Sequence, residues 1–435
     1  MMSETTIGVW GIAALFLCLA IRIPVGLSLL LVGFGGIWVI EDMRTAIAAM
    51  SAETYSSMSS YSMSVIPLFV LMGNIAGAAG YSQRLYDAAH NWVGHLKGGL
   101  SSATILGCAA FAAVSGSSVA TAVTIGKVAL PQMKRFGYAD GLATGSVAAG
   151  GTLGILIPPS TGFVLYAILT EESIGKLFIA GIIPGLLLTL LFVAVIIIVT
   201  SLYPEQGPAG PATSWREKFA ASFNAMPLIT VILVSIGGIY LGVFTPVEAA
   251  GVGAALVAAM ALMGRRIGLK DFTPIIFETV TMTAMLYLIV IGAHVFGPFL
   301  SLTDIPQTLG ARLSEMGLGP YSTLFLILAG YIVLGMFFDG LAMLVVTLPI
   351  VFPIITGLGF DPIWFGVMSV IVIEMGLITP PVGLNVFVVK AVAADVPMAT
   401  IFRGVFPFWL AMAACLLLLI MMPQLALFLP DQMTH

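Results

Sequence analysis

Apolar runs long enough to cross a membrane recur along nearly the whole chain. Examples are Ile7–Ala20, Val25–Ile40 and Leu186–Leu202. A bilayer core takes about 20 apolar residues per helix. With 60% hydrophobic and 8% charged residues, the chain has too little polar surface for a soluble domain. We therefore expect an all-α polytopic membrane protein, with about a dozen spans or half-spans and the first span retained in the mature chain.

Charge and motif content exclude several function classes. The 16 basic and 20 acidic residues nearly balance, which gives no reason to expect a nucleic-acid partner. The sequence has neither a serine–histidine–acid arrangement nor a phosphate-binding loop. We expect a protein that is not an enzyme and does not use ATP.

A motif with two consecutive prolines occurs twice. "GILIPPST" (Gly154–Thr161) returns as "GLITPPVG" (Gly376–Gly383), 222 positions later, and "RFGYADG" (Arg135–Gly141) aligns at the same shift with "GLGFDPI" (Gly357–Ile363). The chain therefore contains two related halves. The predicted organisation is N-terminal scaffold helices in 1–50, a first repeat in 51–200, a connector with scaffold helices in 201–270, a second repeat in 271–415 and a C-terminal tail in 416–435.

In each half, two apolar arms too short for a comfortable span meet at a short tip, which predicts a re-entrant hairpin. The first hairpin is 98–135, with its tip at Ser115–Ser118, and the second is 321–353, with its tip at Gly335–Gly340. Only the first has basic residues at its open end: Lys97, Lys134 and Arg135. Because cytoplasmic loops are enriched in Lys and Arg, we expect the hairpins to enter from opposite sides, as inverted-topology repeats require.

The proline pairs predict a broken transmembrane helix after each hairpin, at 138–170 and at 362–393. Pro158 and Pro159 lack amide hydrogens and disfavour a helical residue before them. Nearby carbonyls then lose their helical partners, which is costly in hydrocarbon unless protein, water or an ion satisfies them. Freed carbonyls suit a hard cation such as sodium, and the restarted helix favours an anion. A single such break could be only a kink, but the second copy favours a site near the membrane midplane.

Polar residues at the tips and breaks are the candidates for that site. Asp339 stands out because a carboxylate at membrane depth is costly and by default functional. Thr379 and Asn385 add a hydroxyl and an amide near the second break. The serines of the first tip could contact substrate or only bond to their own helix. Glu374 could be a structural acid paired across the bundle.

Five blocks in order resemble the large membrane subunit of tripartite ATP-independent periplasmic (TRAP) transporters. They are "AAFAAVSGSSVATAVTIG" (Ala109–Gly126), "GTLGILIPPS" (Gly151–Ser160), "GIYLGVFTPVEAAGVGA" (Gly238–Ala254), "LGMFFDGLAML" (Leu334–Leu344) and "GLITPPVGLNVFV" (Gly376–Val388). The resemblance covers essentially the whole chain. It implies an elevator-type fold of the ion-transporter superfamily and sodium-driven uptake of an organic acid across a bacterial inner membrane.

The resemblance also implies site residues. Two or more sodium ions would be co-transported, without an organic cofactor. The implied ligands at the first tip and break are Ser115, Ser118, Gly154, Ile157 and Pro159, and those at the second are Gly335, Gly376, Thr379 and Val382. The implied substrate-binding residues are Ser117, Ser118, Ser160, Thr161, Asp339 and Asn385.

The implied partners are a periplasmic substrate-binding protein and a small four-helix membrane subunit. Because the first span begins close behind Met1, we expect the small subunit to be a separate chain. One alternative is an autonomous sodium/carboxylate symporter with the same breaks. Another is an ion channel or membrane scaffold, favoured by the lack of basic residues at the hairpin tips. The sequence leaves the substrate open among C4-dicarboxylates, sialic acid and similar carboxylates.

Overall fold

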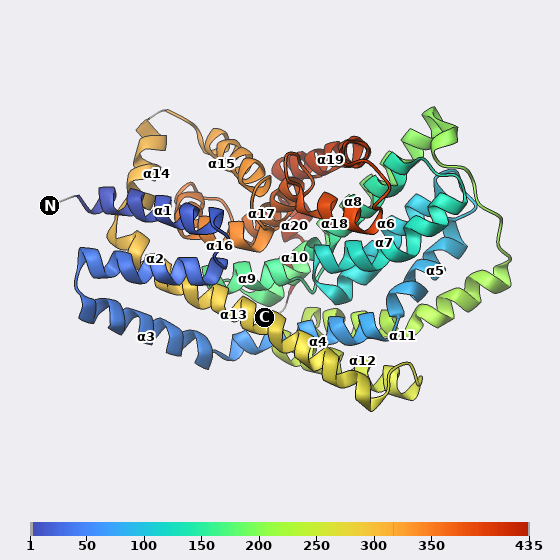
Figure 1. Ribbon diagram of the computed structural model, residues 1–435, viewed down its shortest axis with the longest axis horizontal. Coiled ribbons are helices and arrows are strands. Elements are labelled where there is room, and N and C mark those ends of the chain that lie inside the picture. The colour runs from blue at the N-terminus through green and yellow to red at the C-terminus, as the bar shows by residue number, and fades with distance from the viewer. Residues whose placement is uncertain (1–2, 316, 434–435) are drawn as a thin grey trace.

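Helices build the whole described part of the chain, which in this computed structural model is residues 3–433 except Met316 (Figure 1). No strand occurs among these residues, and eight of their helices are long and apolar enough to cross a membrane. The predicted all-α polytopic class is confirmed. Parts of the predicted segments 1–50, 271–415 and 416–435, namely residues 1–2, 316 and 434–435, lie outside the described residues.

One group of helices forms a scaffold, most of which lies along the lower edge of Figure 1. In it α2 packs along α13, and α4 packs against α12 and α13. Gly26 of α2 allows a close approach, because an added Cβ would lie 2.5 Å from the Leu288 carbonyl of α13. The scaffold helices are α1 (Glu4–Ala20), α2 (Val25–Ile40), α3 (Met43–Ser59), α4 (Val65–Ala78), α11 (Trp215–Tyr240), α12 (Pro246–Met263) and α13 (Phe272–Leu302).

The second group forms a core that contains two hairpins and two broken helices. The first hairpin is α6 (Gly99–Ser115) with α7 (Ser118–Arg135), and the second is α15 (Pro320–Gly335) with α16 (Gly340–Gly357). The broken helices are α8 (Asp140–Leu156) with α9 (Thr161–Thr170), and α17 (Pro362–Leu377) with α18 (Leu384–Val392). The longer α10 (Ile174–Leu202) and α19 (Met398–Met421) complete the core, where α19 packs closely on α8.

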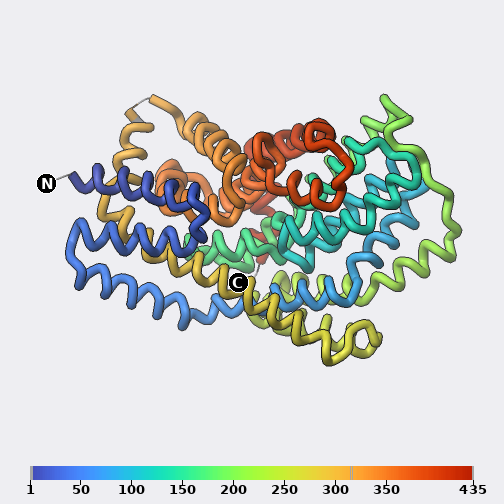
Figure 2. Tube along the Cα trace, viewed as in Figure 1, coloured from blue at the N-terminus to red at the C-terminus, as the bar shows by residue number. Residues whose placement is uncertain are grey.

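The hairpins enter the core from opposite ends (Figures 1 and 2). Lys134, at the open end of the first hairpin, forms an ion pair with Asp395, which follows α18. Tyr166, near the end of α9, donates a 2.7 Å hydrogen bond to the carbonyl of Pro362, where α17 begins after the second hairpin. The second arm of each hairpin also packs on the restarted helix of the other half, α7 on α18 and α16 on α9. This reciprocity is the inverted relation that the sequence predicts.

Each half also contains a short helix that joins scaffold to core. These helices are α5 (Tyr81–Val93), which packs on α6 and α11, and α14 (Ile305–Glu315), which packs on α16. Hydropathy alone does not predict them, because both are polar on one face and shorter than a span. Short 3₁₀ turns occur at η1 (Tyr61–Ser64), η2 (Pro204–Gln206), η3 (Leu269–Asp271) and η4 (Pro430–Gln432).

The C-terminal segment differs from the predicted tail. The division at residue 416 falls inside α19, and the chain beyond it forms α20 (Gln424–Leu427). This helix packs against α10 and α17 and buries Ala426. The apolar composition of the segment explains why it folds back onto the core rather than extending into water.

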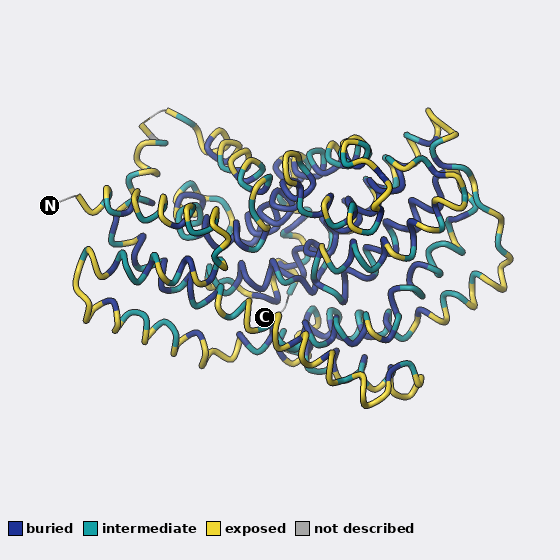
Figure 3. The backbone as a smooth tube through the Cα atoms, in the orientation of Figure 1, coloured by how far each residue is buried: buried dark blue, intermediate teal, exposed yellow. Residues whose placement is uncertain are grey.

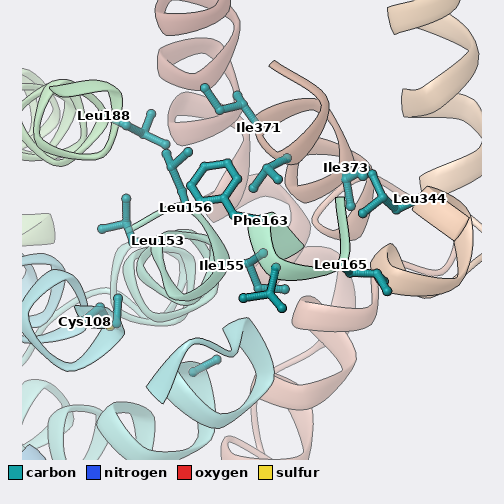
Figure 4. Packing of buried hydrophobic residues seen from close by; sticks show 14 of the residues in the cluster. Cys108, Leu153, Ile155, Leu156, Phe163, Leu165, Leu188, Leu344, Ile371 and Ile373 are labelled. Carbon is teal, nitrogen blue, oxygen red and sulfur yellow. The ribbon is translucent and has the colours of Figure 1, made fainter. Parts of the chain in front are cut away.

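Buried residues gather at the centre of the molecule (Figure 3), where the broken helices of the two halves pack on each other. Phe163, just after the first break, is fully buried. Around it lie Leu156 of α8, Leu188 of α10 and Ile371 of α17 (Figure 4). The first break is therefore enclosed by apolar side chains from both halves.

Candidate functional site

The first hairpin tip docks on the first break. Gly116 ends α6 with a φ of +60°, a conformation that favours glycine, and Ser117 caps α7 by accepting a hydrogen bond from the Ala120 amide. The Gly116 carbonyl accepts hydrogen bonds from the amide (3.3 Å) and the hydroxyl (2.7 Å) of Thr161 at the start of α9. Polar groups of the tip and of the break are therefore hydrogen-bonded to each other.

The backbones of the tip and of α8 touch directly. A Cβ added to Gly154 would lie 2.4 Å from the Ser117 carbonyl oxygen. Ser160 caps α9 by accepting from the Phe163 amide at 3.2 Å, and its hydroxyl donates to the Ile155 carbonyl. The structure therefore gathers the residues named for the first site: Ser115, Ser117, Ser118, Gly154, Ile157, Pro159, Ser160 and Thr161.

A cavity of about 20 Å³ lies beside this first site. From the core, its lining includes Ser115, Ser160 and Thr161, and from the scaffold it includes Phe69 of α4 and Leu286 of α13. Roughly 10–15 Å³ suffices for one water molecule, whereas pockets for organic ligands measure about 300–1,000 Å³. In this conformation the cavity has room for an ion or a water, and residues of the scaffold close it to anything larger.

The second tip and break have the same plan but different partners. Gly335 ends α15 against Gly376, where an added Cβ would lie 3.0 Å from the Gly376 Cα. Asp339 caps α16 by accepting from the Ala342 amide at 3.3 Å, and its side chain is exposed. The Thr379 hydroxyl donates to the Met375 carbonyl at 2.6 Å and accepts from the Trp409 indole at 3.1 Å. In both breaks the bond between the prolines is cis.

The two sites meet at Glu374, which sequence reasoning left as a structural acid. Glu374 is 1% exposed, and its carboxyl accepts from the Asn385 amide at 3.3 Å. It also interacts with the Ser118 hydroxyl of the first tip and with the Asp339 carboxyl of the second. No basic side chain forms an ion pair with it within the described part of the chain. In the sequence, the signal for this position was that Glu374 stands two residues before Gly376, at the second break.

Two residues connect the open end of the first hairpin to the segment after α18. Lys134 and Asp395 form an exposed ion pair beside a cavity of about 200 Å³. The hydrogen bond from Lys134 holds the pKa of the Asp395 carboxyl below its usual value. Lys390 donates to the carbonyls of Ala394 and Val396 and so shapes the same loop. Lys390 therefore has a structural role in this loop.

Comparison with known proteins decides the family. Residues 12–425 match the family described as "Tripartite ATP-independent periplasmic transporter, DctM component". The chain belongs to this family. It is 38% identical over 398 residues to the C4-dicarboxylate TRAP transporter large permease protein DctM of Pseudomonas aeruginosa, covering 91% of this chain and 92% of that protein. The Vibrio cholerae sialic acid TRAP transporter large permease protein SiaM is 33% identical, covering 94% and 95%.

The fold of this TRAP large permease is also seen in a solved structure. The YdaH transporter of Alcanivorax borkumensis, whose structure is described as having an unusual topology, superposes with a TM-score of 0.58. The match covers 89% of this chain and 88% of that one at 13% sequence identity. At that identity the likeness concerns the fold alone.

Proposed function

We propose that this TRAP large permease carries an organic acid anion into the cell together with sodium ions, by an elevator movement in the bacterial inner membrane. The observation that carries the proposal is the docking of each hairpin tip on a broken helix, with Gly116 on Thr161 and Gly335 on Gly376. Backbone carbonyls that lose their helical hydrogen bonds at membrane depth need another partner. If that partner is a cation that binds and dissociates, its binding would be a step of the transport cycle.

The oxygens at the breaks fit sodium. At the first break, a cavity of one-ion size is lined by Ser115 and Gly116 of the tip and by Pro159, Ser160 and Thr161 of the break. At the second, the Thr379 hydroxyl and the backbone of Gly376 and Val382 supply oxygens of the same kind. Alkali and alkaline-earth ions prefer such hard ligands. The α9 N-terminus, at Ser160 and Thr161, would favour the carboxylate of the substrate once the scaffold no longer covers it.

The boundary between core and scaffold supports a sliding movement. The cavity beside the first site is closed on its scaffold side by α4 and α13, so an organic acid reaches Ser160 and Thr161 only after the core shifts. Within the same boundary lies a cavity of about 530 Å³, and its lining includes Ser56, Ser57, Ser60, Ser62, Glu171–Gly175 and His294. A core whose charges are neutralised by bound ions crosses the membrane at lower cost than an unloaded one.

The substrate class and the partners follow from the family. Relatives are named for C4-dicarboxylate and for sialic acid, both carboxylates, and we propose a substrate of this class. A periplasmic binding protein would deliver it, and a small four-helix membrane subunit would pair with this large permease. No ATP is required, since the membrane potential supplies about 2.3 kcal/mol per charge per 100 mV.

Reconstitution tests the proposal. The chain, with the small subunit, is placed in liposomes, and uptake of a radiolabelled carboxylate is followed with and without an inward sodium gradient and with and without the binding protein. We expect uptake only when both are present. Uptake without the binding protein would indicate an autonomous symporter. Sodium-independent uptake would refute the coupling, and unsaturable flux would indicate a channel.

A further inference from the structure

The junction between the two breaks contains a polar cluster in which Glu374 and Asn385 belong to neither proposed sodium site. Glu374 of α17 is 1% exposed, Asn385 of α18 is fully buried, and Ser118 of the first tip is 2% exposed. The Asn385 amide nitrogen donates to Glu374 Oε2 at 3.3 Å, and the Ser118 side chain interacts with the same carboxyl. The cluster therefore joins the first hairpin to both sides of the second break.

Two oxygen atoms of this cluster are buried without a hydrogen-bond partner: Glu374 Oε1 and Asn385 Oδ1. A carboxylate oxygen and an amide oxygen are both acceptors, so neither can satisfy the other. Leaving a buried acceptor unpaired costs about 1–3 kcal/mol, and more for a charged group. The pair of unpartnered oxygens marks a position where a donor or a cation is missing.

The chemistry of the cluster calls for a positive charge at the carboxylate, either a cation or a proton. A proton on Glu374 Oε1 would also neutralise the carboxyl and could be donated to Asn385 Oδ1. The binding experiment below separates this case from a cation, because a protonated carboxyl leaves the number of bound sodium ions the same in Glu374→Gln. A water could donate to both oxygens but would leave the carboxylate charge without a counter-ion, and the described residues place no lysine or arginine in an ion pair with it. One cation between the oxygens satisfies both and balances the charge.

The charge count and the ligand types identify the kind of cation. The cluster has a single carboxylate and otherwise neutral oxygens, so a monovalent ion leaves it neutral. Among the described residues, no group of three or more histidine, cysteine, aspartate and glutamate side chains could hold a metal ion, which argues against a divalent or transition metal. We propose that Glu374, Asn385 and Ser118 form a third alkali-cation site, which takes sodium under transport conditions.

This site adds the side-chain oxygens of Glu374 and Asn385, which neither proposed sodium site uses, to Ser118 of the first tip, and it depends on both halves being in contact. Ser118 belongs to the first tip, whereas Glu374 and Asn385 flank the second break. A cation here would also offset the repulsion between Glu374 and Asp339, whose carboxyls interact. Binding would hold the first tip against α17 and α18. Only the use of this ion in transport rests on the proposed function.

Sodium binding to the purified full-length chain tests the site. Equilibrium binding of ²²Na⁺ and the sodium-induced rise in melting temperature are measured for the wild type, Glu374→Gln, Thr379→Ala and the control Glu278→Gln, an exposed glutamate on α13. We expect Glu374→Gln to bind one ion fewer than the wild type and to show a smaller sodium-induced rise. Without sodium it should melt at the same temperature or higher, because the uncompensated charge is gone. Glu278→Gln should behave as wild type.

The outcomes separate this site from the proposed function. Unchanged ion number and unchanged sodium-induced stabilisation in Glu374→Gln would overturn the site and leave Glu374 a structural acid. Loss of an ion in Thr379→Ala but not in Glu374→Gln would support the break sites alone. If Glu374→Gln binds one ion fewer but uptake by the wild type does not depend on sodium, the cation site stands and the proposed coupling of uptake to sodium is refuted. If Glu374→Gln fails to fold, Glu374→Asp and Asn385→Ala should still fold and bind sodium at least about tenfold more weakly, as expected for loss of one ligand's geometry; wild-type affinity in both would overturn the site.

Discussion

The two proline breaks have closely related sequences but different surroundings. At the first, Pro158, Pro159 and Ser160 are buried, and Thr161 ties the hairpin tip to α9. At the second, Pro380 and Pro381 are exposed, and Val382 is 38% exposed. The same local chemistry is therefore closed in one half and open in the other. An internal repeat supplies two breaks of related sequence, and packing against different neighbours makes them unequal.

The packing behind this difference can be traced to specific elements. The first break is covered by α4 and α13 of the scaffold, through Phe69 and Leu286. The second break is contacted by α19, where Trp409 donates to Thr379 and Phe402 packs against Gly383. In the proposed elevator movement, a scaffold contact would be lost as the core slides, whereas a contact to α19 would move with the core. The closed break would then be the one that this movement uncovers.

Removing the negative charge of Asp339, in the half with the exposed break, should have the largest effect on uptake. Asp339→Asn keeps an N-cap acceptor for α16 but removes the carboxylate, and we expect sodium-driven uptake in liposomes to fall to the background of empty vesicles, with unchanged yield of folded protein. Asp339→Ala should add a loss of about 1 kcal/mol in stability from the missing cap. Full uptake by Asp339→Asn would remove Asp339 from the site.

Adding a methyl group to the closed half should be the next most damaging change. Gly154→Ala places a Cβ 2.4 Å from a tip carbonyl, and overpacking of this kind costs about 1–3 kcal/mol. We expect a lower melting temperature and loss of uptake. The matched control is Gly330→Ala in α15, where an added Cβ meets nothing within 4 Å; it should be neutral or stabilise by up to about 1 kcal/mol. Equal melting temperatures would show that the tip does not dock there.

Thiol labelling should report the difference in exposure directly. After replacement of Cys18, Cys108 and Cys415, Val382→Cys should react with a membrane-impermeant maleimide at least about tenfold faster than Ile157→Cys, a difference of about 1.4 kcal/mol in local opening. Equal rates would mean that both breaks have the same access.

The hydrogen bond that closes the first break can be tested in the same assay. Thr161→Val removes the hydroxyl that donates to Gly116 at 2.7 Å, a change worth about 1 kcal/mol. Labelling of Ile157→Cys should then accelerate about fivefold, while labelling of Val382→Cys stays constant. An unchanged rate at position 157 would assign the closure to apolar packing alone.

The ion pair at the open end of the first hairpin should matter least. Lys134→Gln is expected to change uptake by less than about twofold, because exposed pairs are weak. Since Lys134 depresses the pKa of Asp395, the pair contributes at pH values above the ordinary aspartate value and is lost as pH falls through the lowered one. Uptake should therefore show no effect of this pair between pH 6 and 8, measured as the wild-type to Lys134→Gln ratio; a ratio that changes in that range would contradict the assignment.

Much of the fold could be predicted because the deciding signals are local. Proline pairs, polar tips and short apolar arms act within a few residues of where they stand, and the hairpins and broken helices lie where the sequence places them. Local signals also exist for some residues whose role was missed. Glu248 completes a capping box with Thr245 at the start of α12, and the spacing of these two residues is a local signal of the helix start.

The rest depends on contacts between distant segments. Trp409 reaches Thr379 from another helix, and His294 bonds Ser57 across 237 positions at 2.8 Å. A single sequence contains no signal that such distant residues are in contact. The unequal exposure of the breaks is likewise a property of packing, since "GILIPPST" and "GLITPPVG" differ little in polarity.

The interlocking of α7 with α18 and of α16 with α9 has a consequence for synthesis. Gly154 and Gly376 are 222 positions apart, so the ribosome completes the first hairpin long before its counterpart exists. Until then, polar backbone and serine hydroxyls have no native lining and must be sheltered by the insertion machinery or remain near the interface. The transport core is therefore assembled after translation of the second half, as a single late event.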